Sequence, residues 1–290
     1  MTAPANDINR SPLLEVVGVS KSFGGLTALQ DVSIEIATGK TVGLVGPNGA
    51  GKTTLFNCIF GVTRPDTGTV SFDGRDITDL AIHKRARLGI GRTFQRMELF
   101  TSMTVREHLV VAALARRDTG RLWKDLLHQG NPGSDQLAEV DETLRLLGLE
   151  DVRNAPVDTL SVGHGRLVEL GRALMCHPRL LMLDEPSSGL DSGETEALID
   201  TLESVRNDNE LAVLLVEHDL EMVSELVDRL YVLDFGKLIA EGPTDQVLAD
   251  AGVRKAYLGD APSLPASPPP LPSPGIAPAD DDALGDFSDG

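Results

Sequence analysis

The chain has 290 residues, 41% of them hydrophobic and 24% charged, which is enough to bury a full core and to form one or two lobes. Its formal net charge of −18 argues against a general nucleic-acid-binding protein, because contacts with phosphates need a basic face. No apolar run reaches the length of a membrane helix, and the first residues lack the pattern of a signal peptide.

The first part of the chain predicts a flexible end followed by strands. Residues 1–12 are small and polar, and we expect them to be flexible. Apolar and polar residues alternate over 14–19 and 32–36, as in half-buried strands, and 70–72 read as a strand that enters a tight turn at Asp73-Gly74. These strands predict a small antiparallel sheet.

The most specific motif follows a predicted buried strand at 41–45. Residues 46–54 match G-x-x-x-x-G-K-[ST], and the helix expected over 53–60 ends at Gly61. Such a loop turns its backbone N–H groups toward phosphate oxygens, while the lysine reaches the β- and γ-phosphates and the first threonine can bind Mg²⁺. The nucleotide-binding residues are Gly46, Pro47, Asn48, Gly49, Ala50, Gly51, Lys52, Thr53 and Thr54.

Helical periodicity dominates from about 93 to 172. Thr104 and Glu107 form a capping box that opens a helix running to about 117, and another helix ends at Gly148. The two cysteines, Cys58 and Cys176, lie in apolar helical patterns, so we expect small core residues in a reducing cytoplasm rather than a disulfide or a metal pair.

Strands return in the last third of the chain. Short apolar runs at 180–183, 213–216 and 230–233 are typical of strands buried on both faces, and helical patterns near 193–207 and 219–228 separate them. This alternation predicts an α/β fold with a mainly parallel sheet.

Two carboxylates follow the first of these strands. Asp184 at the strand tip can hold Mg²⁺, and Glu185 can face a water in line with the γ-phosphate and act as general base. Alone, the pair could be a strand that ends in acidic turn residues. Its position after a phosphate-binding loop favours the catalytic interpretation.

Two further elements have structural and functional interpretations. Ser161 and Gly163 open a predicted helix, where they could form an anion site or a simple N-cap. His218 follows the strand at 213–216, where a single histidine is more often structural than functional.

In this order, the motifs resemble the ATP-binding subunit of an ABC transporter over about residues 13–260. The resemblance implies a P-loop NTPase fold with a RecA-like core, an antiparallel β subdomain and a helical subdomain inserted at about 93–175. It also implies ATP and Mg²⁺, catalytic roles for Lys52, Gln95, Glu185 and His218, and metal contacts from Thr53, Gln95 and Asp184. Phe23 matches the residue that stacks on adenine, although a buried core phenylalanine is the alternative. The implied motifs are Walker A at 46–54, the Q-loop at Gln95, the signature at 160–164, Walker B at 180–185, the D-loop at 188–191 and the switch histidine His218.

The chain also resembles the ATPase subunits of branched-chain amino acid importers. This resemblance lies in residues 93–96, 99–100 and 103–105, in the extended connection 118–134 and in the ending 256–259. Urea-type importers and lipopolysaccharide-export ATPases share much of this pattern. The resemblance implies a homodimer or heterodimer of ATP-binding subunits, integral membrane permease subunits, an extracytoplasmic solute-binding protein, and a peripheral location on the cytoplasmic face of the membrane. Ser161 and Gly163 would then contact the nucleotide of the partner.

Some features depart from the family or favour other classes. Val162 and His164 replace a glycine and a glutamine of the usual signature, which leaves the hydrolysis rate open. The segment 261–290 holds eight of the 17 prolines, and we expect it to be disordered. A soluble ABC ATPase that acts on DNA or ribosomes would usually carry tandem cassettes or long coiled-coil insertions, and this sequence shows neither. A GTPase would need an Asn-Lys-x-Asp motif, and the sequence has no Asn-Lys pair. The intact Lys52, Asp184, Glu185 and His218 argue against a non-catalytic interaction module.

Overall fold

The computed structural model describes residues 11–93, 99–116, 133–208 and 210–253. Gln95, most of the connection 118–134, the residues 256–259 and the tail 261–290 therefore lie outside the described residues.

An antiparallel sheet of four strands, in the order β2-β1-β4-β5, forms from the first part of the chain, as predicted. The turn between the last two strands lies at Asp73 and Gly74, whose φ angles of 53° and 72° are both left-handed. Two successive positive φ angles suit the twist of a two-residue hairpin. The strands are β1 Leu14–Phe23, β2 Leu26–Ile36, β4 Thr67–Phe72 and β5 Arg75–Asp76.

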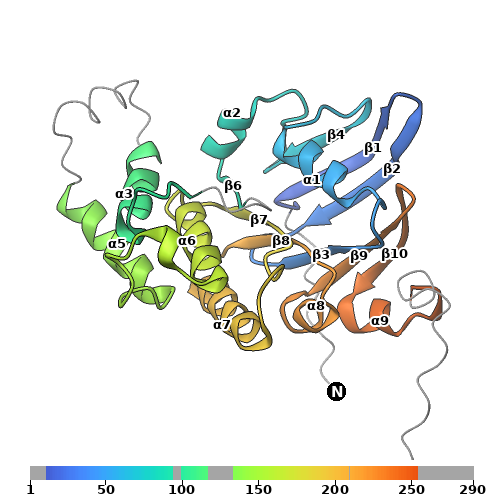
Figure 1. Cartoon of the computed structure of the whole chain (residues 1–290). Helices are drawn as coiled ribbons and strands as arrows, with labels where there is room; N and C mark the ends of the chain where they lie inside the picture. The colour runs from blue at the N-terminus through green and yellow to red at the C-terminus, as the bar shows by residue number, and fades with distance from the viewer. Residues whose placement is uncertain (1–10, 94–98, 117–132, 209, 254–290) are drawn as a thin grey trace, which may run out of the picture. The chain divides into compact units, whose positions relative to one another are not determined.

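The second sheet has six strands in the order β10-β9-β3-β8-β7-β6 (Figure 1). All of its neighbouring strands are parallel except β10, which is antiparallel to β9, and this confirms the predicted mainly parallel sheet. The short β6 and the edge strand β10 were not predicted from the sequence. The strands are β3 Thr41–Val45, β6 Ile90–Arg92, β7 Leu180–Asp184, β8 Ala212–Val216, β9 Arg229–Asp234 and β10 Lys237–Pro243.

The central strands are buried on both faces, which explains their unbroken apolar runs. In β8, Val213 and Leu215 join one hydrophobic cluster, and Leu214 and Val216 join the other. Side chains alternate between the faces of a strand, so one short segment contributes to both clusters. One cluster contains residues of β1, β2, β4 and α1 (Lys52–Phe60), and the other contains residues of the remaining long helices.

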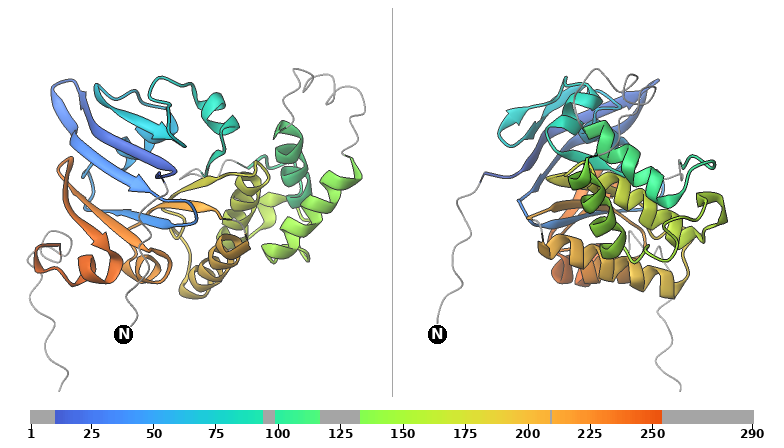
Figure 2. Two further views of the ribbon diagram at one scale, coloured as in Figure 1. Left: turned by 180° about the vertical axis from the view of Figure 1, so that it is seen from behind. Right: turned by 90° about the vertical axis from the view of Figure 1, so that its left-hand side faces the viewer.

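Three helices, α3 (Val105–Arg116), α5 (Ser134–Leu146) and α6 (Val162–Leu174), pack against one another, and Figures 1 and 2 show them side by side. The predicted capping box of α3 is present: the amide of Thr104 donates to the Glu107 carboxylate at 2.7 Å, and the amide of Glu107 donates to the Thr104 hydroxyl at 3.3 Å. The predicted end of the next helix near Gly148, with φ 63°, is also confirmed.

The remaining helices connect the strands. The helices α7 and α8 match the predicted patterns, whereas α2, α9 and the 3₁₀ turn η1 were not predicted. Cys58 is fully buried as expected, but the expectation for Cys176 is wrong, because this residue follows the end of α6 and is exposed. These elements are α2 Ile82–Arg87, η1 Val157–Thr159, α7 Ser192–Asp208, α8 Leu220–Leu226 and α9 Thr244–Ala249.

Candidate functional site

The loop between β3 and α1 has a backbone that only glycine fits at two positions. At Gly46 the φ angle is 147°, and a Cβ atom there would lie 2.1 Å from the carbonyl oxygen of Leu233. At Gly51 the φ angle is 106°, and a Cβ atom would lie 2.5 Å from the carbonyl oxygen of Ala28. Neighbouring backbone therefore fixes the path of this loop directly before the N-terminus of α1, which is the geometry that suits an anion.

Lys52 lies inside this loop. Its Nζ donates to the carbonyl oxygens of Gly46 at 2.6 Å and Pro47 at 3.1 Å, and the residue is only 7% exposed. Burial lowers the pKa of the Lys52 ammonium, and the nearby carboxylates of Glu185 and Asp184 oppose that shift. The structure thus brings the predicted lysine and both predicted carboxylates into one electrostatic neighbourhood.

A cavity of about 400 Å³ adjoins the loop and combines polar groups with an apolar wall. Phe235, which the sequence analysis did not single out, belongs to that wall; it is 85% exposed and has a left-handed φ of 42°. Phe23 does not line this cavity, and its half-exposed ring lies 5.4 Å from Lys21 Nζ. The lining residues are Leu26, Thr27, Ala28, Asn48, Gly49, Ala50, Gly51, Lys52, Thr53, Thr54, Glu185 and Phe235.

The two carboxylates at the end of β7 have different surroundings. Asp184 is 2% exposed, and its Oδ2 lies 3.4 Å from an Nη of Arg92. Burial raises the pKa of the Asp184 carboxyl, and the Arg92 guanidinium opposes that rise. Glu185 reaches the cavity instead, from a left-handed backbone with φ 50°. A buried carboxylate and a cavity-lining carboxylate therefore stand next to each other in the chain.

His218 lies two residues after the end of β8, at the same sheet edge as the loop 46–54 and the two carboxylates. Its side chain is 61% exposed, while the neighbouring Glu217 is fully buried. The Nδ1 of His218 lies 3.6 Å from Oε2 of Glu217. Three predicted groups thus share one edge of the sheet because β3, β8 and β7 are parallel and adjacent.

Ser161 is the N-cap of α6, and Gly163 lies in the first turn of that helix. The Ser161 hydroxyl caps the helix by accepting from the amide of His164 at 3.2 Å, and it also lies 3.2 Å from Nδ1 of that histidine. The amide of Gly163 donates to the Glu194 carboxylate at 3.2 Å. The lining of the cavity around Lys52 includes neither Ser161 nor Gly163.

These residues fit a nucleoside triphosphate and a magnesium ion. A Cβ atom built at Gly49 would have no residue other than its chain neighbours within 4 Å, so the loop is open at this position. At Gly46 and Gly51, by contrast, the loop packs closely against neighbouring backbone. Within the described residues no cluster of three or more histidine, cysteine or acidic side chains could hold a metal alone. A magnesium ion here would combine Thr53 and Asp184 with phosphate oxygens, as magnesium sites commonly do.

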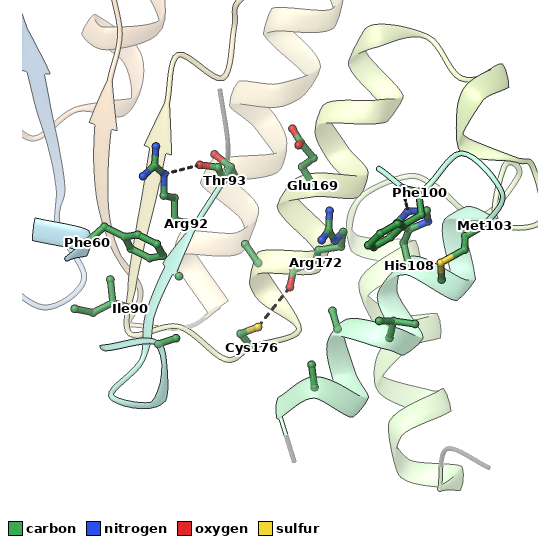
Figure 3. Close-up of a pocket in the computed structure, with 16 residues that line it drawn as sticks. Phe60, Ile90, Arg92, Thr93, Phe100, Met103, His108, Glu169, Arg172 and Cys176 are labelled. Carbon is green, nitrogen blue, oxygen red and sulfur yellow. Dashed lines mark hydrogen bonds between the residues drawn. The ribbon is translucent and has the colours of Figure 1, made fainter. Parts of the chain in front are cut away.

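A second cavity, of about 290 Å³, lies between β6 and the helices α3 and α6 (Figure 3). Its lining is mainly apolar and includes Phe60, Phe100 and Met103. His108 forms part of the wall, with its ring stacked on that of Phe100 at a centroid distance of 6.0 Å. The strand β6 ends at Arg92, close in sequence to the segment 94–98 that contains Gln95.

Comparisons with known proteins agree with this geometry. A model of the ABC transporter family matches residues 29–188, and a model of the branched-chain amino acid ATP-binding cassette transporter matches residues 237–262. The chain is 39% identical to the high-affinity branched-chain amino acid transport ATP-binding protein LivG of Salmonella typhimurium, over 86% of this chain and 99% of LivG. It is 38% identical to BraF of Pseudomonas aeruginosa, over the same shares, and 34% identical to the lipopolysaccharide export system ATP-binding protein LptB of Haemophilus influenzae, over 86% and 98%.

Solved structures show the same fold. The ADP conformation of MJ1267, an ATP-binding cassette of an ABC transporter, superimposes with a TM-score of 0.77 at 31% identity, over 87% of this chain and 100% of that one. A dimeric post-hydrolysis state of the cassette MJ0796 bound to ADP and phosphate gives a TM-score of 0.68 at 25% identity, over 80% and 98%.

Proposed function

The chain belongs to the ATP-binding proteins of ABC transporters, in the branched-chain amino acid transporter family, and on that basis we propose that it powers import of branched-chain amino acids or a related small polar solute. As an ABC ATPase it hydrolyses ATP to drive transport. The observation that carries the solute class is the family match at 237–262 together with the likeness to LivG. The likeness to LptB supports a lipopolysaccharide-type exporter as the second candidate. A urea-type importer is a further transport alternative, and a non-transport ABC ATPase is the alternative from another class.

We propose that the loop 46–54 binds the phosphates, with Lys52 at the β- and γ-phosphates. Thr53, Asp184 and Gln95 would hold Mg²⁺, which would supply positive charge to offset that of the phosphates. Phe23 is the proposed partner of adenine, and the position of Phe235 in the cavity wall supports a second aromatic contact with the nucleotide.

The proposed chemistry is attack of water on the γ-phosphorus. Glu185 takes the proton of this water, the bond to the bridging oxygen of ADP breaks, and ADP and phosphate are released. Lys52 and His218 offset the negative charge that develops in the transition state. The cavity that contains both Lys52 and Glu185 supports these assignments.

We propose that two ATP-binding subunits pair head to tail, as a homodimer or a heterodimer. Ser161 and Gly163 of one subunit would then contact the γ-phosphate held by the other. Two observations support this: neither residue lines the cavity of its own chain, and the dimeric MJ0796 cassette has the same fold. ATP favours the closed pair because that state makes contacts with ATP that the open pair lacks.

The membrane partners follow from the family. None of the helices in the described ranges is long and apolar enough to cross a membrane. We propose that separate permease subunits contact the helices α3 and α6, where the apolar cavity of Figure 3 supports such a contact. A solute-binding protein outside the membrane would complete the importer, and this chain would lie on the cytoplasmic face.

We also propose that residues 13–260 form the ABC domain, with a helical subdomain at about 93–175, and that 1–12 and 261–290 lie outside it.

The solute proposal is tested with the chain and the permease subunits encoded beside its gene, reconstituted in liposomes. We expect ATP-dependent uptake of labelled leucine. Uptake of urea alone, or extraction of lipopolysaccharide instead of uptake, would replace the proposal.

A further inference from the structure

A buried carboxylate joins the ends of β7 and β8. The side chain of Glu217 is fully buried and accepts hydrogen bonds from backbone amides on two segments. Its Oε1 accepts from the amide of Ser187 at 2.8 Å, and its Oε2 accepts from the amides of His218 at 3.0 Å and Asp219 at 3.5 Å. Burying an ionised carboxylate costs free energy unless its oxygens are well satisfied, and here backbone amides satisfy both of them.

On one side this carboxylate restrains the segment that carries Glu185. The backbone of Glu185 is left-handed, with φ 50°, and its amide donates to the carbonyl of Val216 at 2.8 Å. Two residues later, the amide of Ser187 meets Glu217. Consecutive residues at the end of β8 therefore hold the segment at two points. A strained backbone of this kind persists only where surrounding contacts determine it.

On the other side the same carboxylate fixes the segment that carries His218. Its Oε2 accepts the amide of His218 and lies 3.6 Å from Nδ1 of that ring. The segment then turns into α8, where the Asp219 carboxylate caps the helix by accepting from the amide of Glu221 at 2.9 Å. The position of His218 is thus set by Glu217 before it and by a capped helix after it.

We propose that Glu217 is a positioning residue that sets Glu185 and His218 relative to each other for the chemical step. The inference rests on the proposed function, in which Glu185 is the base and His218 offsets charge. A displacement of about 1 Å at such groups can slow the chemical step by about a hundredfold while ATP binding, which depends on the loop 46–54, is kept. Glu217 needs no contact with ATP for this role.

The test is Glu217→Gln, which keeps the size of the side chain. A glutamine has one carbonyl oxygen and one NH₂ group, so it can accept from Ser187 or from His218 but cannot serve both. Glu225→Gln is the matched control, because it removes one charge from an exposed position on α8. Glu185→Gln is measured in parallel. The readouts are kcat and KM for ATP, affinity for a fluorescent ATP analogue, the melting temperature, and the dimer fraction with ATP and Mg²⁺ on size exclusion.

We expect Glu217→Gln to lower kcat at least tenfold with KM and nucleotide affinity within about twofold, and to accumulate an ATP-bound dimer as Glu185→Gln does. A merely structural defect cannot produce that gain of dimer. Glu225→Gln should match the wild type. A wild-type kcat in Glu217→Gln, or a parallel loss of fold and ATP binding both there and in Glu217→Asp, would overturn the inference. If Glu185→Gln itself keeps wild-type turnover, the proposed base fails, which is a separate and distinguishable result.

Discussion

The amide of Gly163 at the N-terminus of α6 donates a 3.2 Å hydrogen bond to the carboxylate of Glu194 from α7. A helix N-terminus favours negative charge, and in this chain that position already binds a carboxylate. A Cβ atom at Gly163 would lie 2.7 Å from this carboxylate oxygen, so the approach depends on the absence of a side chain. The contact supports the prediction that Ser161 and Gly163 form an anion site, which in the proposed pair would receive the phosphate of the partner.

We expect Ser161→Arg to reduce ATPase activity by at least about tenfold, because a long cation would occupy the space needed for the two subunits to close. Phosphate release from the purified chain is the measurement. Ser161→Ala is the matched control, since it removes the helix cap without adding bulk, and it should be less severe. Full activity of Ser161→Arg would contradict shared sites.

A mixture of variants tests the head-to-tail arrangement more sharply. In a mixed pair of Ser161→Arg and Lys52→Ala subunits, one intact phosphate-binding loop faces one intact signature. We expect partial recovery of phosphate release on mixing, beyond the sum of the two separate activities. No recovery at any ratio, with mixed dimers present by size exclusion, would count against a single working shared site.

Lys52→Ala should weaken ATP binding itself. The substitution deletes a buried positive charge, and a hydrogen bond to a charged group contributes about 1.5–3 kcal/mol, which corresponds to an affinity loss of roughly 10- to 100-fold. Titration with a fluorescent ATP analogue measures this, and Lys40→Ala, an exposed lysine outside the cavity, is the control. Equal affinity in the Lys52 variant and the control would mean that the nucleotide binds elsewhere.

Phe235 offers a test of the apolar wall. Because its exposed ring lines the cavity, we expect Phe235→Ala to weaken ATP binding by roughly tenfold, within the 1–3 kcal/mol that base stacking on an aromatic ring contributes. Phe235→Tyr keeps the ring and should bind ATP normally. The same titration on Phe23→Ala shows whether the aromatic predicted from the family contributes as well. An unchanged affinity in Phe235→Ala removes this residue from the site.

His108 predicts a pH dependence of stability. The ring is 2% exposed, Nε2 accepts from the amide of Phe100 at 2.9 Å, and Nδ1 lies 2.9 Å from the carbonyl oxygen of Thr104. This arrangement needs the neutral ring. Burial lowers the pKa of His108 below its usual 6.5, with the hydrogen bond to Thr104 opposing the shift.

The unfolded chain therefore binds a proton at His108 at a higher pH than the folded chain does. The contribution of the neutral His108 ring to the free energy of unfolding is fully present above about pH 6.5. It falls as the pH drops toward the folded-state pKa, by at most about 1.4 kcal/mol per pH unit. The free energy of unfolding, measured with urea at several values between about pH 7.5 and about pH 5, should fall with this slope in the wild type. The slope should be shallower in His108→Gln. Identical slopes would contradict the neutral buried ring.

Local patterns in the sequence were enough to predict most of the fold. The loop 46–54, the capping box at Thr104 and the central strands follow rules that depend on a few neighbouring residues, and all are present. The edge strand β10 alternates between exposed and partly buried residues and gains its pairing from β9, which a short window does not reveal. Cys176 fits an apolar helical period but follows the last turn of α6, where that period no longer points into the core.

Long-range contacts account for what the sequence could not predict in the site. Phe235 is about 180 residues after the loop 46–54, and its place follows from the amide of Gly236, which donates to the carbonyl of Ala50 at 2.9 Å. No local pattern in the sequence distinguishes Arg85, yet it is buried and donates to the carbonyls of Cys58 and Ile59 near the end of α1. Pairings of this kind depend on tertiary packing rather than on local pattern.

The central claim is that Glu185 is the base of an ATPase whose phosphates are held by the loop 46–54. Phosphate release and ATP-analogue binding, measured together on wild type and Glu185→Gln, test it most directly. We predict that Glu185→Gln binds ATP with unchanged affinity, loses turnover by at least about a hundredfold, and accumulates an ATP-bound dimer, because the base is lost and the phosphate-binding loop is kept. Wild-type turnover in Glu185→Gln, with the protein monomeric in ATP and Mg²⁺, would contradict it.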